Sequence, residues 1–125
     1  MKQHIKRLPD AEWEVMQALW ACQAPAESTE IEKQLHRDPP MAATKLLTLL
    51  SRLEGKGFLR REKQGRGNLY TPLVGQEEYL AAQSRRFVDT LCGGDLSVFA
   101  SALCESGLSR EEIEELRKLL EGGGL

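Results

Sequence analysis

The segment from residue 44 to residue 72 constrains the fold of this chain more than any other stretch. Four leucines in it recur at intervals of three and four residues, the spacing of one buried face of an α-helix: Leu46, Leu49, Leu50 and Leu53. Lys56-Gly57 is a stop signal, because a cation suits the last turn of a helix and glycine tolerates the positive φ that ends it. The segment therefore predicts a helix over about residues 42–56. Strands over residues 58–63 and 69–73 then flank a glycine-rich tip, Gly65-Arg66-Gly67.

Two shorter helices are predicted upstream of this helix. The first spans residues 10–21 and carries a helical stripe of large apolar residues, Trp13, Met16, Leu19 and Trp20. The second runs from residue 28 to residue 36, with Ser28 or Thr29 as its N-cap and with Thr29 and Glu32 at capping-box spacing. Three short helices followed by a hairpin are the winged form of the helix-turn-helix.

The overall charge of -2 hides an asymmetry along the chain. Residues 1–73 carry 12 Lys+Arg against 9 Asp+Glu, whereas residues 74–125 carry 5 against 10. Residues 42–72 alone contain 7 basic and 2 acidic residues, so positive charge concentrates in the helix and hairpin. The net charge argues against a nucleic-acid partner, but its distribution argues for double-stranded DNA.

The polar side of the third predicted helix and the hairpin supply the candidate DNA contacts. They are Thr44, Lys45, Thr48 and Arg52 on the helix, and Arg60, Arg61, Lys63 and Arg66 on the hairpin. Lys45 and Thr48 lie one turn apart and are expected to reach base edges, whereas the wing arginines are expected to touch phosphate. Two other interpretations remain, because polar helix faces are often simply solvated and charged hairpins also protect sheet edges from aggregation. For Arg52 a further alternative is that its side chain caps the end of its own helix or forms an ion pair in the neighbourhood of Glu54.

Three more short helices are predicted after Pro72. One spans residues 77–91, with Leu80, Phe87, Val88 and Leu91 as its apolar positions. A break at Gly93-Gly94 precedes a second helix capped by Asp95. A third begins at a capping box made by Ser109 and Glu112.

These C-terminal helices predict a dimerisation domain. Each is too short to be stable alone, and about 50 residues rarely build a sufficient core unaided, so a second copy of the chain is the simplest cover for their apolar stripes. We expect a winged-helix domain over residues 1–73 and a helical dimerisation domain over residues 74–125. The candidate dimerisation residues are Leu80, Phe87, Leu91, Phe99, Leu103, Ile113, Leu116 and Leu120.

The sequence offers little support for an enzyme or a metalloprotein. Cys22, Cys92 and Cys104 are odd in number and lack the close spacing with which metal sites usually begin. No phosphate-binding loop, carboxylate pair or nucleophile–base pair stands out, so we predict no catalytic residue, no metal and no cofactor. No run of about 18 apolar residues occurs and the N-terminus lacks the apolar core of a signal peptide, so we expect a cytoplasmic protein.

Three segments, taken in order, resemble the penicillinase and methicillin-resistance repressors, the BlaI/MecI family that also includes the copper-responsive CopY repressors. They are residues 8–16 with Leu19-Trp20 for the opening helix, residues 48–53 with Lys56-Gly57 for the recognition helix, and Gly65-Arg66 with Tyr70-Thr71-Pro72 for the wing. The resemblance implies a homodimeric repressor that binds palindromic operators, often upstream of β-lactamase genes. It places Lys45 and Thr48 where the recognition helix meets the groove.

The resemblance also implies a route of release in β-lactamase systems. There, a membrane-bound sensor protease triggers cleavage at an Asn-Phe bond in the C-terminal helices, which weakens the dimer. This chain carries Ser101-Ala102 near that place and contains no Asn-Phe bond. The cysteine-rich C-terminal hook of the copper-responsive branch is also absent from the sequence.

The sequence thus predicts a mainly α protein with a small β-hairpin wing, acting as a sequence-specific homodimeric repressor and not as an enzyme. The mechanism expected is steric, since a dimer bound at a promoter excludes polymerase. Two alternatives remain: a winged-helix module that binds proteins and never DNA, and a repressor that senses a ligand at the domain junction.

Overall fold

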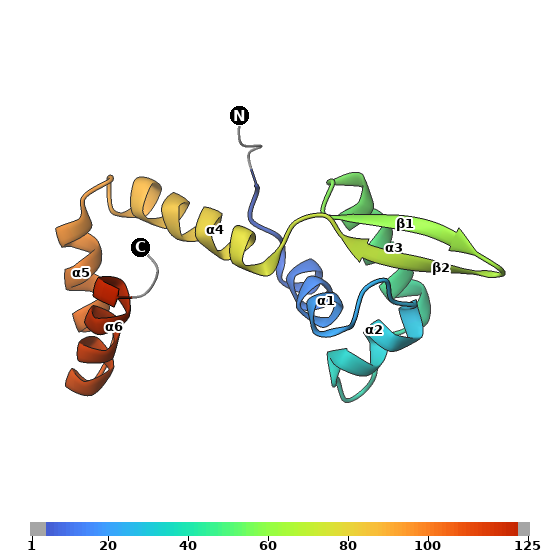
Figure 1. Cartoon of the computed structure of the whole chain (residues 1–125), viewed down its shortest axis with the longest axis horizontal. Helices are drawn as coiled ribbons and strands as arrows, with labels where there is room; N and C mark the ends of the chain where they lie inside the picture. Colours follow the sequence, from blue (N-terminus) through green and yellow to red (C-terminus); the bar gives the residue numbers. More distant parts are fainter. Residues whose placement is uncertain (1–4, 123–125) are drawn as a thin grey trace. The chain divides into compact units, whose positions relative to one another are not determined.

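The structure, a computed structural model, describes residues 5–122 and is mainly helical with one two-stranded sheet, as predicted. In chain order (Figure 1) the elements are α1 (Asp10–Ala21), α2 (Ser28–Leu35), α3 (Ala43–Gly55), β1 (Leu59–Gln64), β2 (Gly67–Pro72), α4 (Gln76–Leu91), α5 (Leu96–Glu105) and α6 (Arg110–Gly122). They form two compact units: a winged-helix unit over residues 1–83 and a C-terminal unit over residues 84–125. No single helix within residues 5–122 is long and apolar enough to cross a membrane; α4 and α5 pass that test only together, across a bend of 101°.

The first three helices enclose the core of the winged-helix unit. α1 packs against both α2 and α3. The side chains between them are almost completely removed from solvent: Val15, Met16 and Leu19 from α1, Ile31 from α2, and Leu46, Leu50 and Leu53 from α3. Burying one such side chain contributes about 1.5–3 kcal/mol. The leucine stripe predicted for the third helix is therefore confirmed as its core face.

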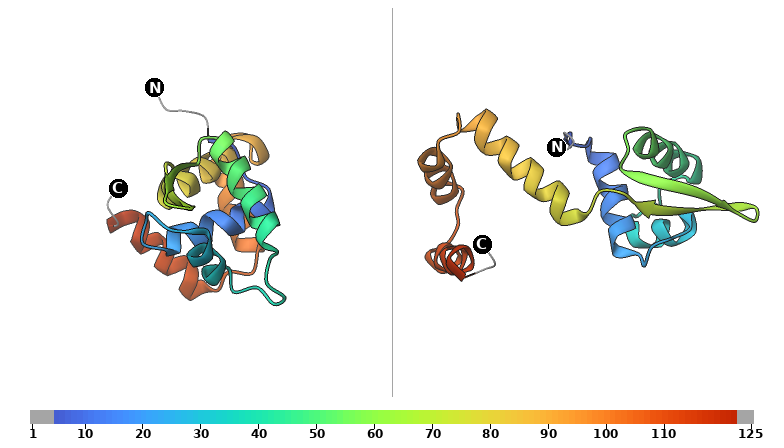
Figure 2. Two further views of the ribbon diagram at one scale, coloured as in Figure 1. Left: turned by 90° about the vertical axis from the view of Figure 1, so that its right-hand side faces the viewer. Right: turned by 45° about the horizontal axis from the view of Figure 1, so that its top comes forward.

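The wing is an antiparallel hairpin that projects from the three helices (Figures 1 and 2). Its register ends with Gln64 opposite Gly67, so Gly65 and Arg66 form a two-residue turn. Gly65 has a φ of 60°, whereas Arg66 does not take a positive φ. Positive φ at the first turn residue alone is the pattern of a type II′ turn, whose twist matches that of the strands.

A short extended segment between α1 and α2 pairs with β2 and so links the wing to the helices. Ala26, between α1 and α2, donates its N–H to the carbonyl of Tyr70 at 3.0 Å and accepts the N–H of Tyr70 at 2.8 Å. Both residues are buried. Tyr70 therefore packs against the helices.

α2 begins with a different cap from the one predicted. Glu27 is the N-cap: its side chain accepts the backbone N–H of Glu30, and the Glu30 carboxylate accepts the N–H of Glu27 at 3.0 Å. The expected caps Ser28 and Thr29, and the capping box of Thr29 with Glu32, are therefore wrong. The physical reason is tertiary, because pairing of the preceding residue with β2 holds the chain extended until Glu27.

α3 ends in a Schellman motif. The N–H of Phe58 donates to the carbonyl of Leu53 at 2.9 Å, and the N–H of Gly57 donates to the carbonyl of Glu54 at 3.0 Å. Gly57 takes the left-handed conformation that this motif requires, with a φ of 82°. Phe58 and Leu53 are both buried. The stop predicted at Lys56-Gly57 is confirmed, and the chain turns there from α3 into β1.

Gly57→Ala is expected to destabilise the winged-helix unit by about 1–2 kcal/mol, because an L-residue at positive φ is strained. A Cβ at this position meets nothing within 4 Å, so the cost comes from the backbone and not from a clash. Gly55→Ala is the matched control, since Gly55 also has open space but lacks a positive φ. It is expected to be neutral or to stabilise by up to about 1 kcal/mol. Urea unfolding measures both, and equal effects would contradict the assigned conformation.

The first turn of α4 packs onto the winged-helix unit through Tyr79, which is 4% exposed. Its ring stacks on Trp13 with the ring centroids 5.0 Å apart, and Trp13 meets Trp20 edge-on at 5.7 Å. The Tyr79 hydroxyl accepts the N–H of Leu8 at 2.8 Å. The two tryptophans of the predicted apolar stripe thus pack against the core, and α4 supplies the tyrosine that completes their cluster.

This packing places the division between the two units inside α4. The winged-helix unit continues to residue 83, beyond the domain boundary predicted after residue 73. The sequence missed Tyr79 because the apolar pattern of the helix was assigned to other positions. Of the four residues expected to form that pattern, Val88 is buried, whereas Leu80, Phe87 and Leu91 are exposed.

The helices of the C-terminal unit begin where the sequence predicts. The Asp95 carboxylate caps α5 by accepting the N–H of Ser97 at 2.9 Å. Hydrogen bonds from the Ser97 hydroxyl and then from its amide hold the pKa of Asp95 below its ordinary value. At the start of α6, Glu112 accepts the N–H of Ser109 at 2.9 Å and donates its own N–H to the Ser109 hydroxyl at 3.0 Å. Both predicted caps are therefore confirmed.

Candidate nucleic-acid interface

The face of α3 opposite its leucine stripe is exposed along the helix. All four predicted helix contacts are exposed: Thr44, Lys45, Thr48 and Arg52. Residues three and four apart are neighbours on a helix surface. By that spacing one contiguous group, here called the central patch, consists of Thr44, Leu47, Thr48 and Ser51. Lys45 and Arg52 each neighbour Thr48 and line one edge of the central patch.

The hydroxyl of Thr48 has a defined orientation. Its Oγ1 donates to the backbone carbonyl of Thr44 at 2.9 Å, a common bond for threonine inside a helix. The hydroxyl hydrogen is therefore already used, which leaves a lone pair and the methyl group to face outward. Thr48 is equipped to accept a hydrogen bond or to make an apolar contact, and not to donate.

The wing carries exposed cations on both of its faces. Arg61 and Lys63 alternate with Arg60 along β1, so they lie on the same face as the buried Leu59 and Arg60 lies on the other. Two of these cations have carboxylate partners: Arg60 has Glu62 at 3.1 Å, and Arg61 has Glu54 of α3 at 3.4 Å. Within the described part of the chain, Lys63 and Arg66 have no such partner within 4.0 Å. These two are the wing cations most available to a phosphate.

One basic residue of the segment is bound to the protein itself. The Lys56 Nζ lies 2.5 Å from Oε1 of Glu12, whose side chain is almost fully buried in the first turn of α1. A buried carboxylate is costly unless it is paired, so this contact fixes the end of α3 to the start of α1. The pairing of Lys56 with Glu12 is absent from the features that the sequence predicts. The available signal was position, since Glu12 precedes Val15, Met16 and Leu19 at helical spacing and so lies on the buried stripe.

Comparison with known proteins decides the family. Residues 8–122 match the family model described as Penicillinase repressor. The chain belongs to the penicillinase repressor family. This is a family of transcriptional repressors with DNA-binding winged helices, and not a family of enzymes.

Individual members of the penicillinase repressor family resemble the chain over most of its length. The penicillinase repressor of Bacillus licheniformis is 34% identical over 118 residues, which cover 94% of this chain and 91% of that protein. The methicillin resistance regulatory protein MecI of Mammaliicoccus sciuri is 33% identical over 115 residues, which cover 90% and 92% respectively. The solution structure of the DNA-binding domain of the repressor BlaI superposes with a TM-score of 0.51 at 33% identity, covering 63% of this chain and 94% of that domain.

The C-terminal unit of this penicillinase repressor family member leaves most of its apolar side chains uncovered. No residue of α5 or α6 is buried. Within residues 84–122 the buried apolar residues are Val88, in α4, and Cys92, directly after α4. The rings of Phe87 and Phe99 meet edge-on at 5.8 Å. Among the predicted dimerisation residues, Leu80, Phe87, Leu91 and Leu120 are exposed, whereas Phe99, Leu103, Ile113 and Leu116 are half-buried.

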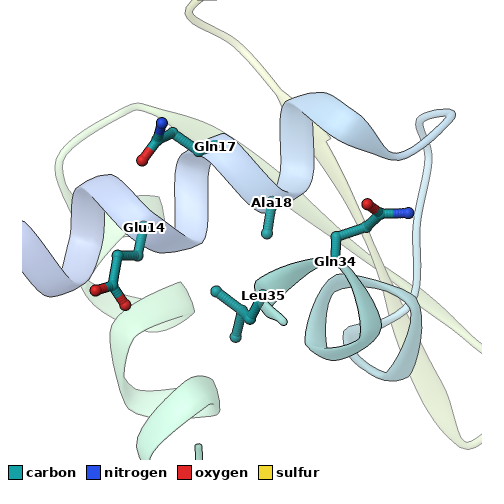
Figure 3. Close-up of a pocket in the computed structure, with 5 residues that line it drawn as sticks. All are labelled: Glu14, Gln17, Ala18, Gln34 and Leu35. Atoms are coloured by element: carbon teal, nitrogen blue, oxygen red, sulfur yellow. The ribbon is translucent and has the colours of Figure 1, made fainter. Parts of the chain in front are cut away.

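A hollow of about 230 Å³ lies between α1 and α2 of the repressor (Figure 3). Its lining residues are Glu14, Gln17, Ala18, Gln34 and Leu35. The carboxylate of Glu14 in this lining repels phosphate. A guanidinium nitrogen of Arg37 lies 3.7 Å from one oxygen of that carboxylate. The hollow therefore does not suit the phosphate backbone of DNA.

The cysteines of the repressor are free thiols. Burial, and then the charge of Glu30, raise the pKa of the Cys22 thiol above its ordinary value, so Cys22 is protonated near neutral pH. Within residues 5–122 no group of three or more His, Cys, Asp and Glu side chains is placed to hold a metal ion.

Proposed function

We propose that this chain is a cytoplasmic homodimeric repressor that binds a palindromic operator and excludes polymerase from the promoter. The observation that carries the proposal is the free polar face of α3 beside exposed wing cations, in a chain of a repressor family. In this proposal Lys45 and Thr48 reach base edges in the major groove, and the wing binds the phosphate backbone. The names of the relatives favour β-lactam resistance genes, or other stress-response genes, as the regulated set.

The dimer in this proposal is supported by the C-terminal unit. A helix pair with no buried residue lacks a core of its own, and the exposed leucines on α4 and α6 offer a second copy an apolar surface. Two winged-helix units bind one palindrome far better than either alone, because the second engagement is intramolecular. Separation of the protomers, whether by a sensor protease or by another inducer, therefore releases the operator without altering a DNA contact.

A mobility-shift assay with genomic fragments at physiological salt tests the proposal. The full chain is expected to retain a small set of fragments in the presence of excess random DNA, with a symmetric sequence common to them. If no fragment is retained above the random competitor, the proposal fails and the winged-helix module that binds proteins becomes the better account.

Replacing Arg66 and Lys63 by Ala is expected to weaken binding to all DNA sequences about equally. Each lost phosphate contact lowers the slope of log affinity against log salt by about one unit. Titrations at several salt concentrations measure that slope. Arg110→Ala, which removes one positive charge from the C-terminal unit, is the control for each single replacement and is expected to leave the slope unchanged. A wing variant with the wild-type slope would mean that the cations only protect the sheet edge.

A further inference from the structure

The central patch of α3 contains a large apolar residue that the core does not use. Leu47 is 47% exposed, although the same helix buries four other leucines on its opposite side. It lies three residues from Thr44 and four from Ser51, so polar side chains border it on one side, and Ala43 and the buried Leu50 are its neighbours on the other. Single exposed apolar residues are common on proteins, and exposure alone assigns Leu47 no role.

The chemistry around Leu47 supplies the second observation. The Thr48 hydroxyl hydrogen is bound to the Thr44 carbonyl, so Thr48 offers the central patch a methyl group and an acceptor lone pair but no free donor. None of the four residues in the central patch carries a charge or an amide donor. Bidentate reading of guanine or adenine needs such donors, whereas the C5-methyl of thymine is read by apolar contact in the major groove.

The charge around the central patch favours DNA as its occupant over an apolar protein surface. Lys45 and Arg52 line one edge of the patch, and Arg61 of the wing lies beyond the other edge, paired with Glu54. A protein partner that covered Leu47 would have to desolvate these cations or provide acidic groups for them. A DNA duplex supplies phosphates at the edges and methyl groups at the centre of one groove.

We propose that Leu47 is a specificity-determining residue that contacts the C5-methyl group of a thymine in each half of the operator. This inference rests on the proposed function and adds to it the chemical group that α3 reads. Leu47 supplies the apolar surface, the Thr48 methyl extends it, and Lys45 supplies the adjacent donor.

The test uses the full chain and duplexes that it selects from a random-sequence library. Each thymine of the selected site is replaced in turn by deoxyuridine, which removes the methyl group and keeps every hydrogen-bonding atom. Cytosine with a C5-methyl presents the same group, so a parallel series carries cytosine or 5-methylcytosine at each selected cytosine. The variants compared are wild type, Leu47→Ala and Leu73→Ala. Leu73 is the matched control because it is 54% exposed in the same unit but lies outside α3.

At one or more thymines in each half-site, loss of the methyl group is expected to lower wild-type affinity about three- to fourfold, the effect of one lost apolar carbon. Leu47→Ala is expected to bind the thymine and uracil duplexes equally, while Leu73→Ala discriminates as the wild type does. Equal discrimination by Leu47→Ala and wild type would overturn the inference, as would sensitivity confined to the cytosine series. If no duplex is selected at all, both the proposed function and this inference fail. If a duplex is selected but its affinity does not depend on the thymine methyl groups, only the role of Leu47 is refuted.

Discussion

Leu91→Glu combined with Leu120→Glu is expected to produce monomers and to lower operator affinity by about 10²- to 10⁴-fold, the range that linked binding sites gain over single ones. Leu91 is 72% exposed and Leu120 is 53% exposed in the single chain, so a charge at either position leaves the protomer intact. In a dimer interface the same charges are desolvated without partners, which disfavours association strongly. Sedimentation equilibrium measures the mass, and titration of a palindromic duplex measures the affinity.

The control for this experiment is Leu73→Glu, which places the same charge on an exposed leucine of the winged-helix unit. It is expected to leave the protein dimeric. Leu116 is a less informative site, since it is half-buried within the chain and a charge there also disturbs the protomer. A double variant that remains dimeric would show that Leu91 and Leu120 do not form the interface. Monomers with unchanged operator affinity would show that the dimer does not carry the binding energy.

Tyr79→Ala is expected to lower the free energy of unfolding of the winged-helix unit by about 3–5 kcal/mol, as for other large aromatic residues truncated in a core. The side chain is 4% exposed and stacks on Trp13, and its hydroxyl is the partner of the buried Leu8 N–H. Urea unfolding followed by tryptophan fluorescence measures the loss, because Trp13 and Trp20 both lie against this ring. The protomer concentration is held fixed, since dimerisation contributes to apparent stability.

Tyr79→Phe separates the two contributions. It keeps the ring stack and removes only the hydrogen bond to Leu8, so we expect a loss of about 1–3 kcal/mol from the unsatisfied N–H. If Tyr79→Ala has no larger effect than Tyr79→Phe, the aromatic packing contributes little. If neither variant changes stability, α4 does not anchor on the winged-helix unit.

Features that depend on neighbours along the chain could be predicted from the amino-acid sequence. The leucine stripe of α3 follows from helical periodicity, and its end follows from a glycine that can take positive φ. The wing follows from a glycine turn between two short strands, and the caps of α5 and α6 follow from local side-chain chemistry. The exposure of the four predicted DNA contacts on α3 also follows from helical periodicity, whereas the contact of all eight predicted residues with DNA stays a prediction.

Features that depend on residues far apart in the sequence could be seen only in the folded chain. Glu27 caps α2 because β2 pairs with the chain just before it. The Lys56–Glu12 pair joins residues 44 positions apart, and the Tyr79–Leu8 hydrogen bond joins residues 71 positions apart. Local propensity contains no information about which distant group will arrive beside a given side chain. A charged or polar group that is removed from water needs a hydrogen-bonding or ionic partner, so the free energy of burial favours these long-range pairs.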